Sequence, residues 1–256
     1  MSWTLSPCLE WLFADGAAKF GDRIRAAARA GFRQVEFWTA SDKDVAQLAA
    51  AIDECDVIVS AFLSEPAARI VDPATHPAFL EGVKRSCELA RRLHALNLIV
   101  VSGDTRKDVD RKAQADAIAA ALDRAGEIAA GARVDLVLEP LNTRVDHPGY
   151  FLDSTLEALD IVRAVGRPNV KLLYDLYHST VMGEDAHEVL AGARGLVGHV
   201  HIADAPGRHE PGTGAIDWRR ELEALRASGY DGALGLEYMP MRDTDSSLAF
   251  IRDVAG

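Results

Sequence analysis

Four residues with side chains that can bind a metal each close a short hydrophobic run. They are Glu139, Asp175, His201 and Glu237, which follow one another at intervals of 36, 26 and 36 residues. Such runs predict strands, and α/β proteins concentrate their chemistry where strands end and loops begin. Because the C-terminal ends of parallel barrel strands share one face, we expect the four side chains to converge on one divalent cation.

Three carboxylates and one imidazole form a hard, mixed set of ligands. Such a set suits Mn²⁺, Mg²⁺ or Co²⁺ with open positions for substrate oxygens better than it suits a closed structural zinc site. An acidic residue at a strand end can also be a helix cap or a loop charge that faces solvent. Glu139, however, precedes Pro140, which has no backbone N–H and therefore marks the end of a strand.

Two further polar residues are expected to support this centre. His199 lies two residues before His201, so both side chains point to the same side of a strand. We interpret His199 as a histidine hydrogen-bonded in the core or behind the metal ligands. Glu36, at the end of the second strand, is another candidate for a supporting group, the alternative being a salt bridge toward the helices.

Two residues in expected loops are candidates for binding a substrate. His178 follows Asp175 by three residues and is placed in the loop that leaves the strand, where it can reach a substrate hydroxyl. Arg208 offers a planar fork of donors that suits a carboxylate, although it can also form a loop ion pair with Glu210. Four other histidines are interpreted as surface or helix residues without a role: His76, His94, His147 and His187. The expected pocket walls are Trp11, Phe13, Trp38 and Phe62.

Alternating strands and helices position these residues. Strands are predicted at 3–6, 34–38, 57–62, 98–101, 136–139, 171–174, 196–202 and 233–238. Helices are predicted at 24–30, 45–52, 79–96, 109–130, 154–165, 186–193, 218–228 and 247–254. The strands are continuously hydrophobic, as in a parallel sheet covered on both sides. The pattern predicts an α/β fold with a single (β/α)8 TIM barrel domain over residues 1–256. A doubly wound sheet is the alternative, but no glycine-rich fingerprint follows the first strand.

Strand alternation also predicts which residues face the barrel interior. If Glu237 points inward, Gly235 and Ala233 do so as well, whereas Leu234 and Leu236 pack against the helices. Small residues below Glu237 leave space in the upper layer of the barrel.

Composition restricts the partners. The net charge of −11 disfavours nucleic acid and anionic membranes as partners. The three cysteines have no CxxC spacing, which is typical of free thiols in a reducing compartment. Neither a signal peptide nor a run of 18 apolar residues is evident, so a cytoplasmic protein without a membrane span is expected.

An ordered set of motifs resembles the hydroxypyruvate isomerase family, within the xylose-isomerase-like barrels. The motifs are Val35-Glu36-Phe37, Leu138-Glu139-Pro140-Leu141-Asn142, Pro148-Gly149-Tyr150, Tyr174-Asp175-Leu176-Tyr177-His178, Gly198-His199, Ile202-Ala203-Asp204, Pro206-Gly207-Arg208, Glu210-Pro211-Gly212-Thr213-Gly214 and Gly235-Leu236-Glu237-Tyr238. The resemblance implies metal ligands at Glu139, Asp175, position 201 and Glu237. It also implies dimers or tetramers. This chain departs at His201, where the family usually has glutamine, and at Met239, where it often has lysine.

The expected reaction interconverts hydroxypyruvate and tartronate semialdehyde, or acts on a homologue such as a 2-oxo-tetronate, through an enediolate. Glu139 and Glu237 would serve as general base and acid, His178 would bind a substrate oxygen, and Arg208 would hold the carboxylate. Because His201 is similar to the ligand of ketose 3-epimerases, epimerisation of a free ketose is the main alternative. An abasic-site endonuclease would need a histidine-rich trinuclear zinc cluster and a basic surface. A barrel without activity, serving as a sugar-binding or scaffold protein, is the remaining alternative.

Overall fold

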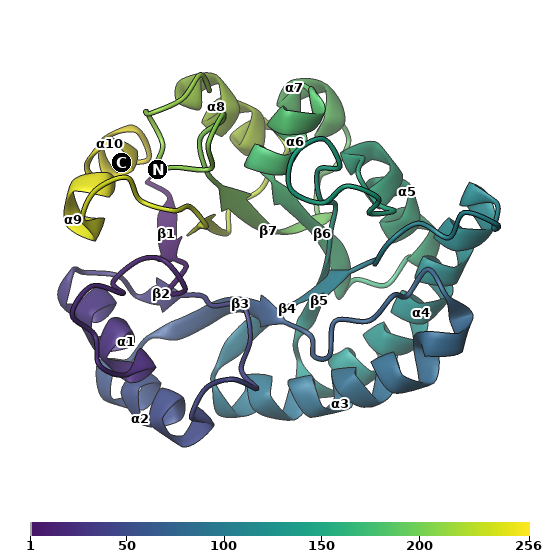
Figure 1. Cartoon of the computed structure of the whole chain (residues 1–256), viewed down its shortest axis with the longest axis horizontal. Helices are drawn as coiled ribbons and strands as arrows, with labels where there is room; N and C mark the ends of the chain where they lie inside the picture. The colour runs from purple at the N-terminus through teal and green to yellow at the C-terminus, as the bar shows by residue number, and fades with distance from the viewer. Residues whose placement is uncertain (1) are drawn as a thin grey trace.

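The computed structural model describes residues 2–256, and within them eight parallel strands form one barrel sheet (Figure 1). The strands are β1 (Thr4–Pro7), β2 (Gln34–Val35), β3 (Ile58–Leu63), β4 (Ala95–Val101), β5 (Asp135–Glu139), β6 (Val170–Asp175), β7 (Val197–Ile202) and β8 (Ala233–Leu236). From β2 to β8 each strand pairs with the next one in sequence, β1 pairs with β8, and an isolated bridge lies between the chains that leave β1 and β2. The predicted (β/α)8 barrel is therefore confirmed.

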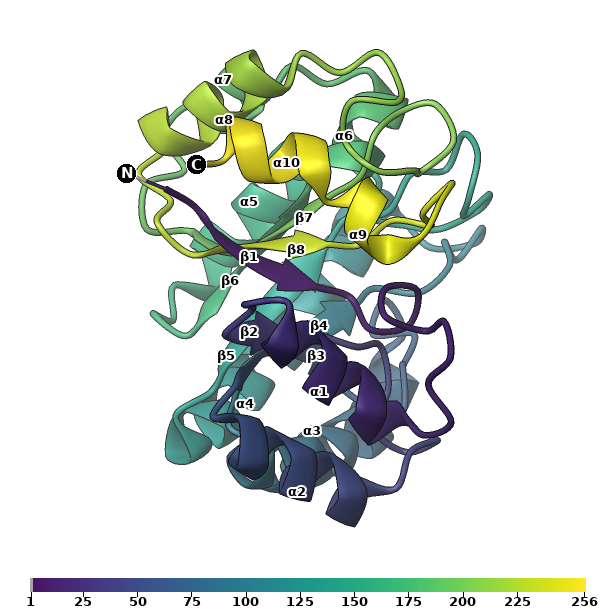
Figure 2. The same cartoon turned by 90° about the vertical axis from the view of Figure 1, so that its left-hand side faces the viewer.

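Helices form an outer layer around the strands (Figures 1 and 2). They are α1 (Phe20–Arg29), α2 (Val45–Cys55), α3 (His76–Arg92), α4 (Arg111–Ala132), α5 (Thr155–Val165), α6 (Leu176–Met182), α7 (Ala186–Val189), α8 (Trp218–Ala227), α9 (Thr244–Ser247) and α10 (Ala249–Val254), with a 3₁₀ turn at Pro73–Thr75 before α3. Asp and Ser side chains cap many of these helices, as Ser154 does for α5 by accepting from the backbone N–H of Glu157. None of the helices in residues 2–256 combines the length and apolarity needed to cross a membrane.

The barrel closes through a short seam between β1 and β2. The two strands meet at one parallel bridge, Cys8 with Glu36. The backbone N–H of Glu36 donates to the carbonyl of Pro7 at 3.0 Å, and that of Leu9 donates to the carbonyl of Glu36 at 2.8 Å. β2 is therefore shorter than the predicted 34–38, because its chain leaves the ladder once this bridge is made.

Apolar side chains fill two layers that the strands separate. The larger layer lies between strands and helices and includes Leu234 and Leu236, both fully buried. A smaller cluster inside the barrel consists of Ala61, Ile99, Val137 and Leu173. A Cβ atom on Gly235 would meet side chains of the interior, so the predicted alternation along β8 is confirmed at residues 234–236.

The boundary between α3 and β4 differs from the prediction. A helix was expected at 79–96, but α3 begins at His76 and ends at Arg92, and β4 already begins at Ala95. His94 adopts a left-handed backbone conformation with φ of +51°, which ends the helical path. No glycine or proline marks this turn, and the apolar residues continue at helical spacing, so the local pattern extends too far. His76, interpreted as a surface or helix residue, is the first residue of α3, where it is buried and its Nε2 bonds to the carbonyl of Ile70.

Two other predicted helices are shorter than expected. The segment 186–193 forms a helix only over α7, and the helix predicted at 247–254 begins at Ala249 as α10. The short helix α9 before it was not predicted, and neither was α6. α6 begins directly after β6, so His178 lies in its first turn rather than in a loop.

Candidate metal centre

The structure brings the four strand-end residues together. Glu139 and Asp175 are the last residues of β5 and β6, His201 lies near the end of β7, and Glu237 follows β8 directly. One ligand atom from each lies within 4.8 Å of the others. All four residues are buried, with exposed fractions of 6%, 4%, 3% and 7% respectively. Parallel register accounts for this meeting, because Asp175 pairs with His201 and His201 pairs with Gly235.

The spacing of these atoms suits a divalent cation. The Nδ1 atom of His201 lies 3.3 Å from Glu139 Oε1, 3.5 Å from Glu237 Oε2 and 3.9 Å from Asp175 Oδ2. Oxygen and nitrogen ligands bound at about 2.1 Å from one cation are themselves roughly 3–4 Å apart. Nδ1 is also buried without a hydrogen-bond partner. The donor set and this unpartnered nitrogen therefore fit a cation with an oxygen-rich environment.

Charge is strongly concentrated at this centre. Burial alone would lower the pKa of His201, but the carboxylates of Glu36, Glu237 and Glu139 raise it to about 10. Burial would raise the pKa of Glu237, yet the positive charges of His201 and Arg208 lower it to about 2. A proton on His201 and the guanidinium of Arg208 thus offset part of the negative charge of the carboxylates, and a bound cation would replace that proton.

Asp175 is both a helix cap and a candidate metal ligand. Its Oδ1 accepts from the backbone N–H of His178 at 2.9 Å and so caps α6. Its Oδ2 turns the other way, toward His201 Nδ1. A carboxylate has enough acceptor sites for both tasks, so the cap holds the side chain in place while one oxygen faces the centre.

His178 presents a hydrogen-bond donor to the centre. Its Nδ1 receives the backbone N–H of Asn142 at 3.2 Å and the side-chain Nδ2 of Asn142 at 2.6 Å. Both partners are donors, so Nδ1 must be the acceptor and the proton lies on Nε2. Nε2 is buried without a hydrogen-bond partner and lies 3.7 Å from Asp175 Oδ2.

The orientation of the Asn142 amide is determined by its neighbours. Its Oδ1 accepts from the backbone N–H groups of Val145 and Asp146, both at 3.0 Å, and its Nδ2 also donates to Asp146 Oδ2 at 2.6 Å. Sequence reasoning assigned no role to Asn142. Its position in the motif Leu138-Glu139-Pro140-Leu141-Asn142 was the available signal.

Arg208 faces Glu237 rather than Glu210. Its Nη2 donates to Glu237 Oε2 at 2.5 Å and lies 3.9 Å from Asp175 Oδ2. The loop ion pair with Glu210 considered above is absent from the described structure, where Glu210 Oε2 accepts from the backbone N–H of Met241. The guanidinium lies over the rings of Trp11 and Tyr177, with its carbon 5.4 Å and 5.3 Å from their respective centroids. Its Nε is buried without a hydrogen-bond partner.

The loop after β7 is organised by a residue that sequence reasoning left without a role. Asp204 is fully buried, and its carboxylate accepts from the backbone N–H groups of Ala205 and Gly212 and from the indole Nε1 of Trp218. Arg208, held in a left-handed conformation with φ of +56°, donates its own N–H to the carbonyl of Asp204 at 3.0 Å. The fold thus stabilises the loop that presents Arg208.

Of the four residues predicted to form pocket walls, two contact residues of the candidate site and two pack elsewhere. Trp11 packs over Arg208, and the indole Nε1 of Trp38 donates to Glu237 Oε1 at 2.7 Å. Phe62 instead packs on Phe37 in the layer between strands and helices, because its neighbour Ala61 takes the inward position. Phe13 packs on Phe32, away from the four strand-end residues.

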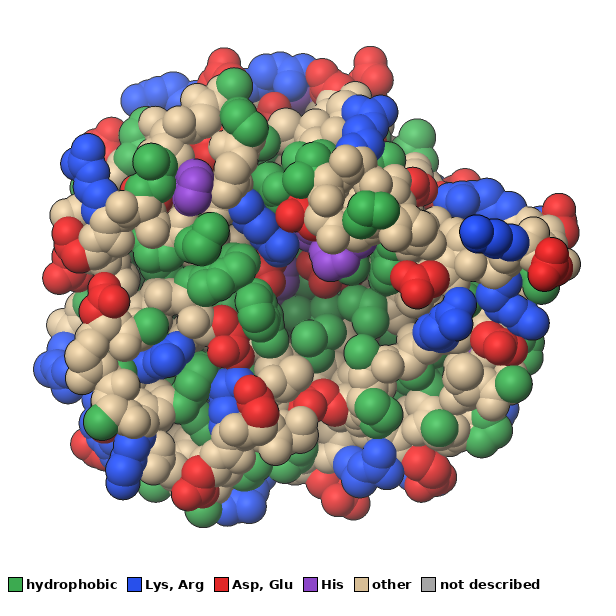
Figure 3. Space-filling model, viewed as in Figure 1, with side chains coloured by type: hydrophobic (Ala, Val, Ile, Leu, Met, Phe, Trp, Pro, Cys, Tyr) green, Lys and Arg blue, Asp and Glu red, His purple; other side chains and the backbone are tan. Residues whose placement is uncertain are grey.

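His147 also lies closer to the site than its prediction as a surface or helix residue implied. Its ring centroid is 5.6 Å from that of His178, and burial together with the positive charge of Arg208 lowers the pKa of His147. In the space-filling view, a hollow in the middle of the face contains histidine, basic and acidic side chains among hydrophobic ones (Figure 3).

The fold and the site define a TIM barrel with a candidate divalent-cation centre at its strand ends. The family model of the xylose isomerase-like TIM barrel matches residues 24–254, so the chain belongs to this family. Expectation and comparison therefore agree on the family.

Relatives in this family carry isomerase names. A Homo sapiens protein named as a hydroxypyruvate isomerase is 32% identical, with 95% of this chain and 92% of the relative covered. The 2-oxo-tetronate isomerase of Cupriavidus necator is 31% identical, with 93% and 94% covered. A solved structure from Brucella melitensis, titled AP endonuclease, family 2, is 31% identical, with a TM-score of 0.90 and 99% of both chains covered. The two relatives with isomerase names place the chain among the isomerases of the family.

Proposed function

We propose that this protein is a metal-dependent isomerase that interconverts the ketone and aldehyde forms of a small hydroxy-carbonyl acid, hydroxypyruvate or a 2-oxo-tetronate. The observation that carries the proposal is the meeting of four buried ligand atoms within 4.8 Å at the strand ends. Two unpartnered donors, His178 Nε2 and Arg208 Nε, lie beside that centre. The isomerase names of the relatives support the same reaction class.

The residues that would hold the cation are Glu139, Asp175, His201 and Glu237. Mn²⁺, Mg²⁺ and Co²⁺ all suit these donors. A cation bound there would polarise the carbonyl and neighbouring hydroxyl of the substrate and stabilise negative charge on their oxygens.

Glu139 and Glu237 are the proposed general base and general acid. Isomerisation moves a proton between two adjacent carbons, and each carboxylate lies within 3.5 Å of His201 Nδ1, Glu139 at the end of β5 and Glu237 directly after β8. Trp38 and Arg208 hold the oxygens of Glu237 by hydrogen bonds. The two carboxylates can therefore face a small substrate from different sides, so that one removes the proton and the other returns it.

His178 and Arg208 are the proposed substrate-binding residues. The N–H at Nε2 of His178 can donate to a substrate oxygen without breaking an existing hydrogen bond. The N–H at Nε of Arg208 is also unpartnered, whereas Nη2 remains with Glu237. A carboxylate beside Arg208 would receive a charge-assisted hydrogen bond, which favours an acidic substrate.

The test is the Glu139→Gln variant assayed with hydroxypyruvate in the presence of Mn²⁺. Loss of the general base is expected to lower kcat by about 10²–10⁴-fold. The matched control is Asp135→Asn, which changes an acid at the opposite end of the same strand, where Asp135 pairs with Lys171. Full isomerase activity in Glu139→Gln would contradict the proposal.

Epimerisation of a free ketose at C3 remains the second candidate. His201 supports it, since ketose 3-epimerases resemble this chain at that position, and the same carboxylates could exchange the proton on opposite faces of C3. Parallel assays with hydroxypyruvate, fructose and tagatose distinguish the two reactions. Turnover of the ketoses but not of hydroxypyruvate would assign the protein to epimerisation.

We also propose that nucleic acid is not the substrate, although the Brucella melitensis structure carries an endonuclease name. The net charge of −11 opposes binding to a phosphate backbone. Among residues 2–256, the two candidate ligand groups share His201 and contain two different histidines, His199 and His201. Anisotropy measurements with a labelled abasic duplex at low salt should show no binding, and saturable binding would refute this proposal.

A further inference from the structure

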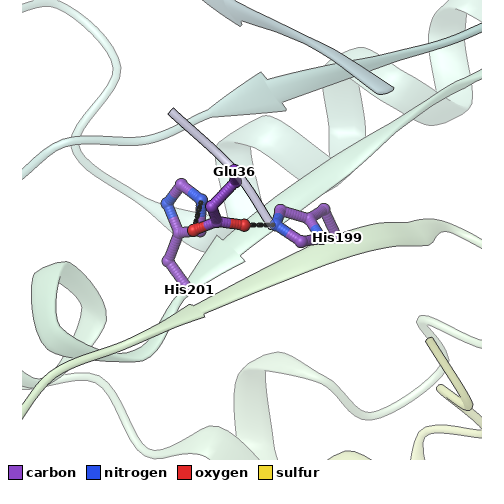
Figure 4. Close-up of side chains that lie close together, drawn as sticks. All are labelled: Glu36, His199 and His201. Carbon is purple, nitrogen blue, oxygen red and sulfur yellow. Dashed lines mark hydrogen bonds and ion pairs between the residues drawn. The ribbon is translucent and has the colours of Figure 1, made fainter. Parts of the chain in front are cut away.

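A second buried cluster lies directly behind His201. It consists of Glu36, His199 and His201. The rings of His199 and His201, two residues apart on β7, approach the carboxylate of Glu36 (Figure 4). The Nε2 of His199 lies 2.8 Å from Glu36 Oε2, and the Nε2 of His201 lies 3.3 Å from Glu36 Oε1. Their exposed fractions of 1–3% show that all three residues are buried away from bulk solvent.

We propose that Glu36 is a positioning residue that holds His201 so that its Nδ1 faces the cation. This inference rests on the proposed function, because it assumes a cation between the four strand-end residues. Glu36 itself touches neither the cation nor the substrate. It acts through His201.

The chemistry of the two ring nitrogens supports this role. An ionised carboxylate can only accept hydrogen bonds, so Glu36 Oε1 favours a proton on Nε2 of His201. That proton leaves the lone pair on Nδ1, which is the nitrogen that faces Glu139, Glu237 and Asp175. A carboxylate behind a metal-binding histidine also makes the imidazole a more basic ligand.

Glu36 is itself held by neighbours from several strands. The hydroxyl of Ser60 donates to Glu36 Oε2 at 3.0 Å, and Ser60 Oγ also lies 2.6 Å from Ser6 Oγ. The backbone of Glu36 forms the bridge that closes the barrel between β1 and β2. Glu36 Oε2 is thus hydrogen-bonded by Ser60 and His199. Glu36 Oε1 and His201 Nε2 have no hydrogen-bond partner, and they face each other at 3.3 Å as an ion pair.

Gly235 provides the space for this carboxylate. A Cβ atom at this position would lie 2.5 Å from Glu36 Oε1, 2.6 Å from Glu36 Oε2 and 2.6 Å from His201 Cδ2. Its backbone does not require glycine by a positive φ angle, so the close approach is the reason for glycine here. Any side chain at 235 would therefore displace the contact between Glu36 and His201.

The test compares Mn²⁺ affinity, measured by calorimetry, in Glu36→Gln and Gly235→Ala. Both variants should bind Mn²⁺ about 10- to 100-fold more weakly than the wild type, the usual effect of losing a group behind a metal ligand. Gly235→Ala keeps every ionisable side chain, so it tests the position of Glu36 even if Glu36→Gln folds poorly. The matched control is Gly198→Ala, in which the new Cβ would be 2.8 Å from Val137 and 3.0 Å from Lys171, on the neighbouring strand β7.

A spectroscopic measurement separates positioning from general stability. In the Mg²⁺ form, the Nε2–H proton of His201 should give a downfield NMR signal protected from exchange, which the two test variants lose and the control keeps. Wild-type affinity in both test variants would overturn the inference and leave the proposed function standing. A wild type that takes up no Mn²⁺, Mg²⁺ or Co²⁺ would overturn both proposals.

Discussion

Two buried histidines face the candidate centre from different elements, and they present opposite chemistry to it. His178, in α6, turns its protonated Nε2 toward the centre, because donors from Asn142 occupy Nδ1. His201, in β7, turns Nδ1 toward the centre and Nε2 toward the carboxylate of Glu36. One ring therefore offers a hydrogen bond, and the other offers a lone pair once its Nδ1 has lost a proton.

The group behind each ring accounts for the difference. A backbone or amide N–H behind an imidazole forces the far nitrogen to carry the proton, whereas a carboxylate behind it frees the far nitrogen for a cation. Residue type alone does not separate these roles. The comparison therefore predicts that His178 binds substrate and that His201 binds the metal, and experiments can test the two roles separately.

His201→Ala should have the largest effect on metal binding. It removes one of four ligands and is expected to weaken Mn²⁺ binding about 1,000-fold, more than the 10- to 100-fold typical of a supporting group. Titration calorimetry measures the change, with circular dichroism to confirm folding. Unchanged affinity would show that the cation, if bound, lies away from His201.

His178→Ala should separate catalysis from metal binding. The loss of one preorganised donor is expected to lower kcat by about 10²–10³-fold. Mn²⁺ affinity should stay within about threefold of wild type, because His178 is not among the expected ligands. Steady-state kinetics and calorimetry on one preparation measure both values. A parallel loss of Mn²⁺ affinity would mean that the two histidines do not have separate roles.

The pH dependence of Mn²⁺ binding should report on His201. With a pKa of about 10 in the metal-free protein, His201 is protonated at neutral pH and must lose a proton to bind a cation. Affinity should therefore rise about tenfold per pH unit from pH 6 to 9 and level off above the pKa. Calorimetry in buffers of different ionisation enthalpy should show about one proton released per cation. The same slope is expected in His178→Ala, and a flat profile would contradict this account.

Asn142→Ala should have the smallest effect of the four changes. The backbone N–H of residue 142 still donates to His178 Nδ1, so the proton stays on Nε2 and kcat should fall by less than about tenfold. The lost amide also leaves the N–H groups of Val145 and Asp146 without their acceptor, at a cost of about 1–2 kcal/mol in the free energy of unfolding. Urea denaturation and kinetics measure the two effects. A fall in kcat as large as that of His178→Ala would show that the side chain, not the backbone, orients the ring.

Local sequence patterns predicted much of the fold, and the predictions that were wrong have local causes. Eight hydrophobic runs and the helices between them predicted the barrel, and two-residue alternation placed Gly235 on the inner side of β8. The end of α3 was misplaced because His94 turns the chain without glycine or proline. α6 was missed because Asp175 was considered chiefly as a ligand, although it also caps that helix.

The sequence by itself determined which residues could form the centre. Strand periodicity and the repeated placement of Glu139, Asp175, His201 and Glu237 at strand ends are local properties, so they are visible without coordinates. Only the tertiary structure decided what stands behind each of them. Glu36 and His199 are 163 positions apart in the chain and meet only because the barrel closes. The direction in which each imidazole presents its proton depends on such distant partners, because a hydrogen bond acts over about 3 Å of space and not along the chain.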